Sequence, residues 1–311
     1  MDVSIVLQPI VLIAFMITIG ALLTRTFTFN NDTRALLISL IVNVAMPSII
    51  LSSIFNVDID DDTIKMIGIV FILSIVINLI GIGLGWLLTG VFSKDLQKKK
   101  EISVLSGLGN TGFIGIPLCL VLFGPEGALY AAIFDAGIDL TIWTVGVLIL
   151  QNKGKISFKT LKSMINMPTI AIVFGLTAAL FQYKPPYLFI ELSNQLAALA
   201  APLAMFYIGV LVMTLKKGSI RNTPIIIVIP IFVKLILLPV VAIPLLLLFS
   251  IEGIAFQTML VQSMMPTLTL ASILFSKYDA DEEFGAVATV LATILALVTI
   301  PSLVYLMSTF I

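Results

Sequence analysis

Long apolar runs recur from one end of this chain to the other and constrain its fold more than any other feature. Runs of about 18 or more residues with few charges are typical of transmembrane helices, because a helix of about 20 residues is needed to cross the hydrocarbon core. Of the 311 residues, 59% are apolar and only 11% are charged. A soluble domain does not need so much apolar surface, so the pattern predicts an all-α polytopic membrane protein.

Ten such runs can be drawn along the chain, and the connections between them are too short to fold as soluble domains. We therefore expect ten transmembrane helices. The predicted spans are residues 4–24, 34–55, 64–91, 102–123, 128–150, 164–182, 187–214, 224–250, 254–275 and 284–310.

Charged residues in the connections alternate between two faces. The connections after the first, third, fifth, seventh and ninth spans carry 14 of the 17 basic residues, among them Arg25, Lys94, Lys155 and Lys216. By the positive-inside rule this face is cytoplasmic. The pattern predicts a multi-pass protein of the cell membrane with both termini outside and the acidic connection 58–62 on the outer face.

Composition also excludes several classes of function. The formal net charge is zero, so no basic surface argues for nucleic acid. There is no histidine, and Cys119 is the single cysteine, which removes imidazole chemistry, a disulfide framework and a multi-cysteine metal site. No glycine-rich phosphate loop is present. We expect no enzyme, no cofactor and no metal site, although a passive channel and an intramembrane enzyme remain open alternatives.

The fourth predicted span is interrupted by the stretch Gly109–Pro117, which reads GNTGFIGIP. Glycine relaxes the backbone, and proline removes a donor and clashes with the preceding turn. Backbone freed from helical pairing persists in a membrane only beside protein or a polar cavity. The stretch therefore predicts a helix broken at mid-membrane depth, where many transporters bind their substrate. The alternative is a proline-kinked helix with tight glycine packing.

A weak internal repeat relates the two halves of the chain. Each half would hold five spans, and because five is odd the halves must have opposite orientations. This predicts two inverted repeats, residues 1–150 and 151–311, with broken fourth and ninth helices that cross at mid-membrane. The matching positions are Gln8-Pro9 with Asn166-Met167-Pro168, Ala45-Met46-Pro47 with Ala200-Ala201-Pro202, and Pro117 with Pro266.

With these residues in view, the chain resembles the auxin efflux carrier family, which includes plant PIN-type carriers and malate-permease-like bacterial and archaeal relatives. The resemblance covers essentially the whole chain. Its most specific parts are Gly109–Pro117, Pro266 followed by Leu274–Tyr278, the closing Ala296–Pro301, and Asn43 with Pro47. The chain lacks the long cytoplasmic loop of the plant carriers and has only residues 151–163 there.

The resemblance implies a bile-acid symporter or sodium/proton antiporter-like fold. Helices 1, 2, 6 and 7 would form a scaffold, and helices 3, 4, 5, 8, 9 and 10 would form the transport core of an elevator-type carrier. It also implies organic anions as substrates and assembly as a homodimer.

Candidate substrate-binding residues surround the two predicted breaks. Half-helix N-termini offer unpaired N–H groups that suit a carboxylate, and Asn110 can both donate and accept hydrogen bonds. Pro117 and Pro266 would hold the breaks open, and the resemblance adds Asn43 and Pro47. The full set is Asn43, Pro47, Gly109, Asn110, Thr111, Gly112, Pro117, Met265, Pro266 and Thr267.

Three ionisable residues fall well inside spans. Asp135 and Asp139 are four residues apart in the fifth span and share a helix face, and Lys234 lies near the middle of the eighth span. Charges at such depth are costly and need partners or a watery cavity. Either these residues couple transport to H⁺ or Na⁺, or Lys234 forms a static ion pair with one of the two carboxylates.

The sequence therefore favours a secondary active transporter of small organic anions, auxin-like or mono- and dicarboxylate, that works by alternating access. The alternative is a cation/proton antiporter of similar fold in which Asp135 and Asp139 bind the ion.

Overall fold

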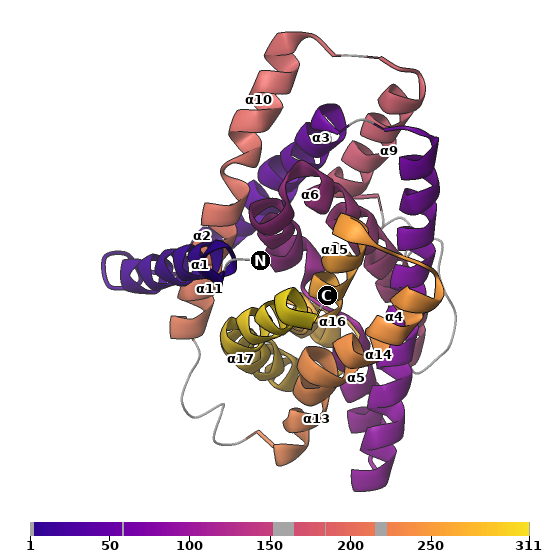
Figure 1. Ribbon diagram of the computed structural model, residues 1–311. Coiled ribbons are helices and arrows are strands. Elements are labelled where there is room, and N and C mark those ends of the chain that lie inside the picture. Colours follow the sequence, from indigo (N-terminus) through magenta and orange to yellow (C-terminus); the bar gives the residue numbers. More distant parts are fainter. Residues whose placement is uncertain (1–2, 58, 152–164, 184, 215–222, 311) are drawn as a thin grey trace.

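The computed structural model describes residues 3–57, 59–151, 165–183, 185–214 and 223–310 (Figure 1). Over these residues the chain forms helices joined by short non-helical segments, and an isolated antiparallel bridge links Gly109 and Thr267. Asp58, Lys155 and Lys216 lie outside the described residues. The alternation of charge between two faces therefore stays a prediction.

Six of the described helices are long and apolar enough to cross a bilayer, which confirms a helical membrane protein. Two shorter apolar helices, Val11–Leu23 and Met167–Leu180, accompany them. The count of ten spans and the inverted repeat remain predictions. The six long helices are Asp32–Asn56, Asp61–Phe92, Thr111–Leu150, Tyr187–Met213, Ile225–Leu248 and Glu282–Leu303.

Several helices begin at side-chain caps, as the sequence favours. Asn30 accepts backbone N–H bonds from Asp32 and Thr33, and Asp60 accepts one from Thr63. The helices of the first half are α1 (Val3–Leu23), α2 (Asn31–Leu40), η1 (Ile41–Ala45), α3 (Met46–Asn56), α4 (Asp61–Phe92), α5 (Leu96–Gly107), η2 (Thr111–Gly115), α6 (Ile116–Thr141), η3 (Ile142–Gly146) and α7 (Val147–Leu150).

The second half contains a further interrupted segment, between α15 and α16. Its helices are α9 (Met167–Leu180), α10 (Tyr187–Ala197), α11 (Ala200–Thr214), η5 (Ile225–Ile227), α13 (Val228–Phe232), η6 (Val233–Leu237), α14 (Leu238–Leu248), α15 (Gly253–Ser263), α16 (Ala271–Lys277) and α17 (Glu282–Phe310).

Prolines explain three wide π-helical turns, η1, η2 and η6. Each of these turns is followed, two residues after its end, by a proline: Pro47, Pro117 and Pro239. A proline inside a helix cannot donate to the carbonyl four residues earlier, and its ring collides with that carbonyl. In all three cases that carbonyl belongs to the π turn, whose wider winding moves it aside. Pro117 therefore shapes a turn. The expectation from the sequence that Pro117 lies in the break is wrong.

Helix α6 contains a reversal of the chain. Gly124 has φ +71° and ψ −161°, outside the helical region, and Pro125 follows it. A Cβ on Gly127 would lie 2.9 Å from the carbonyl oxygen of Cys119. Residues eight apart in a straight helix are about 12 Å apart. The chain therefore folds back at Gly124, and residues 116–123 lie against the start of the returning helix.

The helix contacts fall into two groups, which meet where α6 of the second group packs against α3 and α9 of the first. In the first group α1 packs against α11, and α3 packs against α9 and α10. In the second group α4 packs against α5 and α6, α13 against α5, α14 and α15 against α4, and α16 against α17. Glycines allow the closest contact of the first group, since a Cβ on Gly209 of α11 would lie 2.0 Å from the Ile17 carbonyl oxygen of α1.

Candidate functional site

Two interrupted helices meet through their backbones. The first interruption separates α5 from η2 at residues 108–110, and the second separates α15 from α16 at residues 264–270. The Asn110 N–H donates to the Pro266 carbonyl at 2.7 Å, and the Leu268 N–H donates to the Leu108 carbonyl at 3.1 Å. Each break thus satisfies polar groups that the other leaves free, which is how non-helical backbone persists inside an apolar protein. Both interruptions lie where the sequence predicts them.

A partly open cavity of about 100 Å³ lies beside the first break. Its polar lining comes from three elements that are far apart in the sequence: the break itself, α6 and the start of α9. The polar side chains are Asn110, Asp135, Asp139 and Asn166, and the remaining lining residues are Val42, Met46, Gly109, Gly112, Phe113, Ile138, Ile142, Pro168, Leu268 and Leu270.

The two carboxylates of α6 have different partners. Asp135 accepts a hydrogen bond from the Thr111 hydroxyl at 2.5 Å, so it is tied to the first turn of η2. A Cβ on Gly112 would lie 2.8 Å from Asp135 Oδ2, which explains why glycine fits there. Asp139 accepts from the Asn166 side-chain amide at 2.8 Å, so it is tied to the start of α9. The shared face predicted for the two aspartates does line one cavity.

Asn110 is buried at the edge of the cavity, with 4% of its surface exposed. Its side-chain amide donates to the Thr269 hydroxyl across the crossing. It occupies the N-cap position of η2, yet its side chain makes no capping hydrogen bond. The geometry therefore gives Asn110 a place in the cavity wall and does not give it the role of a side-chain cap.

Residues 5–160 and 155–304 match a family of membrane transport proteins. This chain belongs to that family. The match confirms the resemblance to auxin efflux carriers and malate-permease-like proteins. A family of transporters is also consistent with the expectation that this transport protein is not an enzyme.

Three relatives match almost the full length of this transport protein. An "Uncharacterized transporter" of Methanothermobacter thermautotrophicus is 22% identical over 295 residues, covering 94% of this chain and 96% of the relative. An "Uncharacterized transporter" of Methanocaldococcus jannaschii is 25% identical over 302 residues, with the same two coverages. A "Putative malonate transporter" of Rhizobium meliloti is 23% identical over 309 residues, covering 94% of this chain and 92% of the relative.

Lys234 of the transport protein does not form the expected ion pair. Its side chain in η6 is fully buried, and its ammonium donates to the Gly107 carbonyl at 3.2 Å. Within the described part of the chain no carboxylate pairs with Lys234, so the predicted pair with Asp135 or Asp139 is wrong for this conformation. Gly107 ends α5, and the negative end of a helix dipole attracts a cation. Lys234 thus supports the C-terminus of α5 just before the break.

The other predicted site residues are spread around the crossing. Asn43 does not face the cavity; its side chain is exposed and donates to Ser39 of the same helix at 3.0 Å. Pro266 lies within the second break, where its carbonyl accepts the hydrogen bond from the Asn110 N–H. Pro47, Met265 and Thr267 are buried close to these elements without lining the cavity.

Asn166 is the site residue that sequence reasoning missed. It had been noted only as part of the internal repeat. The signal for its role was present, since an asparagine two residues before a proline at the start of an apolar segment is typical of an N-cap. That signal places the residue at a helix start but does not show that the helix start would face α6.

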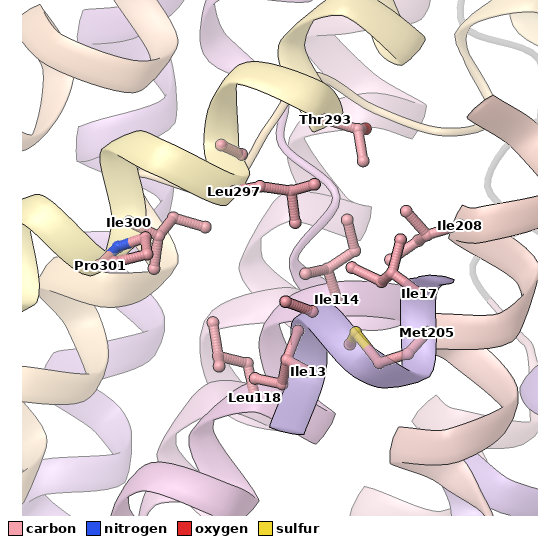
Figure 2. Close-up of a pocket in the computed structure, with 12 residues that line it drawn as sticks. Ile13, Ile17, Ile114, Leu118, Met205, Ile208, Thr293, Leu297, Ile300 and Pro301 are labelled. Atoms are coloured by element: carbon pink, nitrogen blue, oxygen red, sulfur yellow. The ribbon is translucent and has the colours of Figure 1, made fainter. Parts of the chain in front are cut away.

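A second cavity, of about 60 Å³, lies between α1, α11, α17 and the η2–α6 segment (Figure 2). Ile13, Ile17, Ile114 and Met205 contribute to its apolar lining. The only hydroxyl in this lining belongs to Thr293 and already donates to the Thr289 carbonyl at 2.7 Å. An anion would lose its hydration there without gaining hydrogen bonds, so we exclude this cavity as an anion site.

Proposed function

We propose that this transport protein is a secondary active transporter that moves a small organic anion across the cell membrane by alternating access. The observation that carries the proposal is the backbone-paired crossing of two broken helices beside a polar cavity in an otherwise apolar bundle. Broken helices of this kind form the substrate sites of many secondary transporters.

The chemistry of the first break suits a carboxylate. The N–H groups of Thr111, Gly112 and Phe113 lie in the first turn of η2, where a helix offers no carbonyl partners and carries its positive dipole end. Asn110 adds an amide at the same place. We propose that the carboxylate of the substrate binds at this turn, with Asn110 as a direct ligand.

The two aspartates indicate why a cation should accompany the anion. Two unit charges about 5 Å apart repel each other by about 3 kcal/mol at an effective dielectric constant of about 20. A substrate carboxylate beside Asp135 and Asp139 would meet this repulsion unless one aspartate were neutralised. We propose that an H⁺ or Na⁺ ion binds with the substrate, so that its gradient drives transport.

The packing supports an elevator-type division of the helices. We propose that the first packing group, α1, α3, α9, α10 and α11, forms the scaffold and that the second forms the transport core; the contacts of α1 with α11 and of α3 with α9 and α10 support this division. The reversal at Gly124 supports counting residues 102–123 and 128–150 as separate spans. We propose ten spans in two inverted repeats, 1–150 and 151–311, with both termini outside and a homodimeric assembly.

Counterflow in proteoliposomes tests the proposed function. Vesicles loaded with unlabelled malonate should accumulate radiolabelled malonate from outside, and the exchange should saturate. Malonate is the first anion to try because one relative bears that name. Succinate, malate and indole-3-acetate follow. Asn43→Ala is the matched control, since Asn43 lies outside the cavity. Flux without saturation or trans-stimulation would instead indicate a channel.

The second candidate function is cation/proton antiport, which the pair Asp135 and Asp139 in one cavity favours. It predicts that sodium or potassium alone collapses an imposed pH gradient across the vesicles. The proposed anion carrier requires an organic anion for the same proton flux. Comparing the two conditions in one preparation decides between them.

A further inference from the structure

The side chain of Asn166 has a fixed orientation at the start of α9. Its Oδ1 atom accepts from the Thr169 backbone N–H at 2.9 Å and from the Thr169 hydroxyl at 2.9 Å. The oxygen is therefore used by the helix, and the amide nitrogen must point away from it. That nitrogen donates to Asp139 Oδ2 at 2.8 Å.

This hydrogen bond joins the two packing groups. Asn166 begins α9, which packs mainly against α3, whereas Asp139 lies on α6, which packs against α4, α15 and also α3. Asn166 and Pro168 line the same cavity as Asp135 and Asp139. This hydrogen bond thus ties the start of α9 to a carboxylate of the other group, in addition to the packing of α6 against α3 and α9.

We propose that Asn166 is a positioning residue that couples the charge on Asp139 to the position of α9. The inference rests on the proposed function. A charged carboxylate accepts the Asn166 amide hydrogen more strongly than a carboxyl group that carries a proton or binds a cation. Loading Asp139 with its cation therefore weakens its hold on the start of α9. Asp135, bound by Thr111, does not take part in this link.

Substitutions at Asn166 can separate this role from capping. Serine and aspartate cap helices about as well as asparagine, so both preserve the start of α9. Neither can donate to Asp139 as the amide does, and aspartate adds a repelling charge. Alanine removes both the cap and the link. A residue that only caps would tolerate serine and aspartate and would lose thermal stability with alanine.

The experiment uses the full chain with Cys119→Ser and a reporter cysteine, Val42→Cys, in the cavity wall. We expect Asn166→Ser to increase the rate of maleimide reaction about fivefold, because the cavity opens more often, and Asn166→Asp to increase it further. Gradient-driven malonate uptake should fall about tenfold in Asn166→Ser, which is a larger loss than that of malonate counterflow in the same variant.

The proposal is overturned if Asn166→Ser and Asn166→Asp match the parent in labelling rate, or if Asn166→Ser loses counterflow and gradient-driven uptake in equal measure. The labelling rate does not depend on transport of any anion. If the parent protein exchanges none of the anions tried, the proposed function fails, while the labelling comparison still decides the role of Asn166.

Discussion

At the scale of single residues, the cavity depends on side chains that each have one defined partner. Asn110 donates to Thr269, Thr111 to Asp135, and Asn166 to Asp139. Each pair joins two different elements, so a single substitution changes a contact between helices and not only a local hydrogen bond.

The first residue-scale prediction concerns Asn110. Asn110→Ala should lower malonate counterflow about 10- to 100-fold, because an unmade hydrogen bond to a bound anion costs about 1–3 kcal/mol. The melting temperature should fall only modestly, since the variant loses the buried bond to Thr269 but no helix cap. Asn43→Ala should change neither quantity. Unchanged transport with a reduced melting temperature in Asn110→Ala would contradict the ligand assignment.

A second residue-scale prediction concerns a charged cluster at one end of α5. The ammonium of Lys98 lies 2.9 Å from Glu101 and 2.7 Å from Asp281, and the Asp281 N–H donates to Glu101 at 3.0 Å. Burial lowers the pKa of Lys98, but its bonds to Asp281 and Glu101 outweigh burial and raise that pKa above 10.5. Burial raises the pKa of Asp281, but the bond and charge of Lys98 together with backbone N–H bonds from Phe284 and Glu283 outweigh burial and lower that pKa below 3.8.

Lys98→Met should therefore destabilise the protein by about 2 kcal/mol. This loss is smaller than the cost of breaking a fully buried ion pair, because Lys98 is 20% exposed. Adding Glu101→Gln should restore part of the loss. A carboxyl group whose pKa is lower in the folded protein than in the unfolded chain stabilises the fold at pH values above its unfolded pKa. This stabilisation is lost as the pH falls through the pKa of the folded protein. The parent should thus lose its advantage over Lys98→Met in thermal unfolding below about pH 3.8. Additive effects of the two substitutions would argue against the contact.

At the scale of elements, the two breaks and the π turns were predictable to different degrees. Glycine, asparagine and proline within apolar runs predicted interruptions at 109–117 and near Pro266; the first occurs at residues 108–110 and the second at residues 264–270. The assignment of Pro117 to the break was wrong because a proline disturbs the turn that precedes it, here η2. Lys234 was misjudged because span membership gives depth but not which neighbouring backbone the side chain reaches.

The element-scale prediction tests the first turn of η2. Gly112→Ala would put a Cβ 2.8 Å from Asp135 Oδ2. The Asp135 carboxylate would then have to move away from the N-terminus of η2. We expect transport to fall about tenfold or more, together with a lower melting temperature. Gly68→Ala on α4 is the control, because a Cβ there meets nothing within 4 Å. It should be neutral or slightly stabilising. Equal effects of the two substitutions would show that the turn has room for a side chain.

At the scale of the whole molecule, apolar run length was sufficient to predict a helical membrane protein. The residues that meet at the cavity were less accessible to sequence reasoning. Asp135 and Asp139 were found because buried charge is unusual, whereas Asn166 was not, because its role depends on how α9 packs beside α6. Contacts between distant segments are set by packing, which periodicity and composition do not encode.

The whole-molecule prediction is the orientation in the membrane. Helix α4 runs from Asp61 to Phe92 and is long enough to span the bilayer, so its two ends should face opposite sides. In a Cys119→Ser background, Asp61→Cys should react with an impermeant maleimide on intact cells, and Lys94→Cys should react only after permeabilisation. The reverse pattern would place both termini in the cytoplasm.

The backbone pairing between residues 108–110 and 266–268 also bears on how the protein is made. Asn110 and Pro266 bond to each other although they are 156 positions apart along the chain. While the ribosome is still adding the second half, the Asn110 N–H and the Leu108 carbonyl have no such partner in the membrane. The crossing can therefore close only late in synthesis. Until then the first half must depend on water, lipid headgroups or the insertion machinery to shield those two backbone groups.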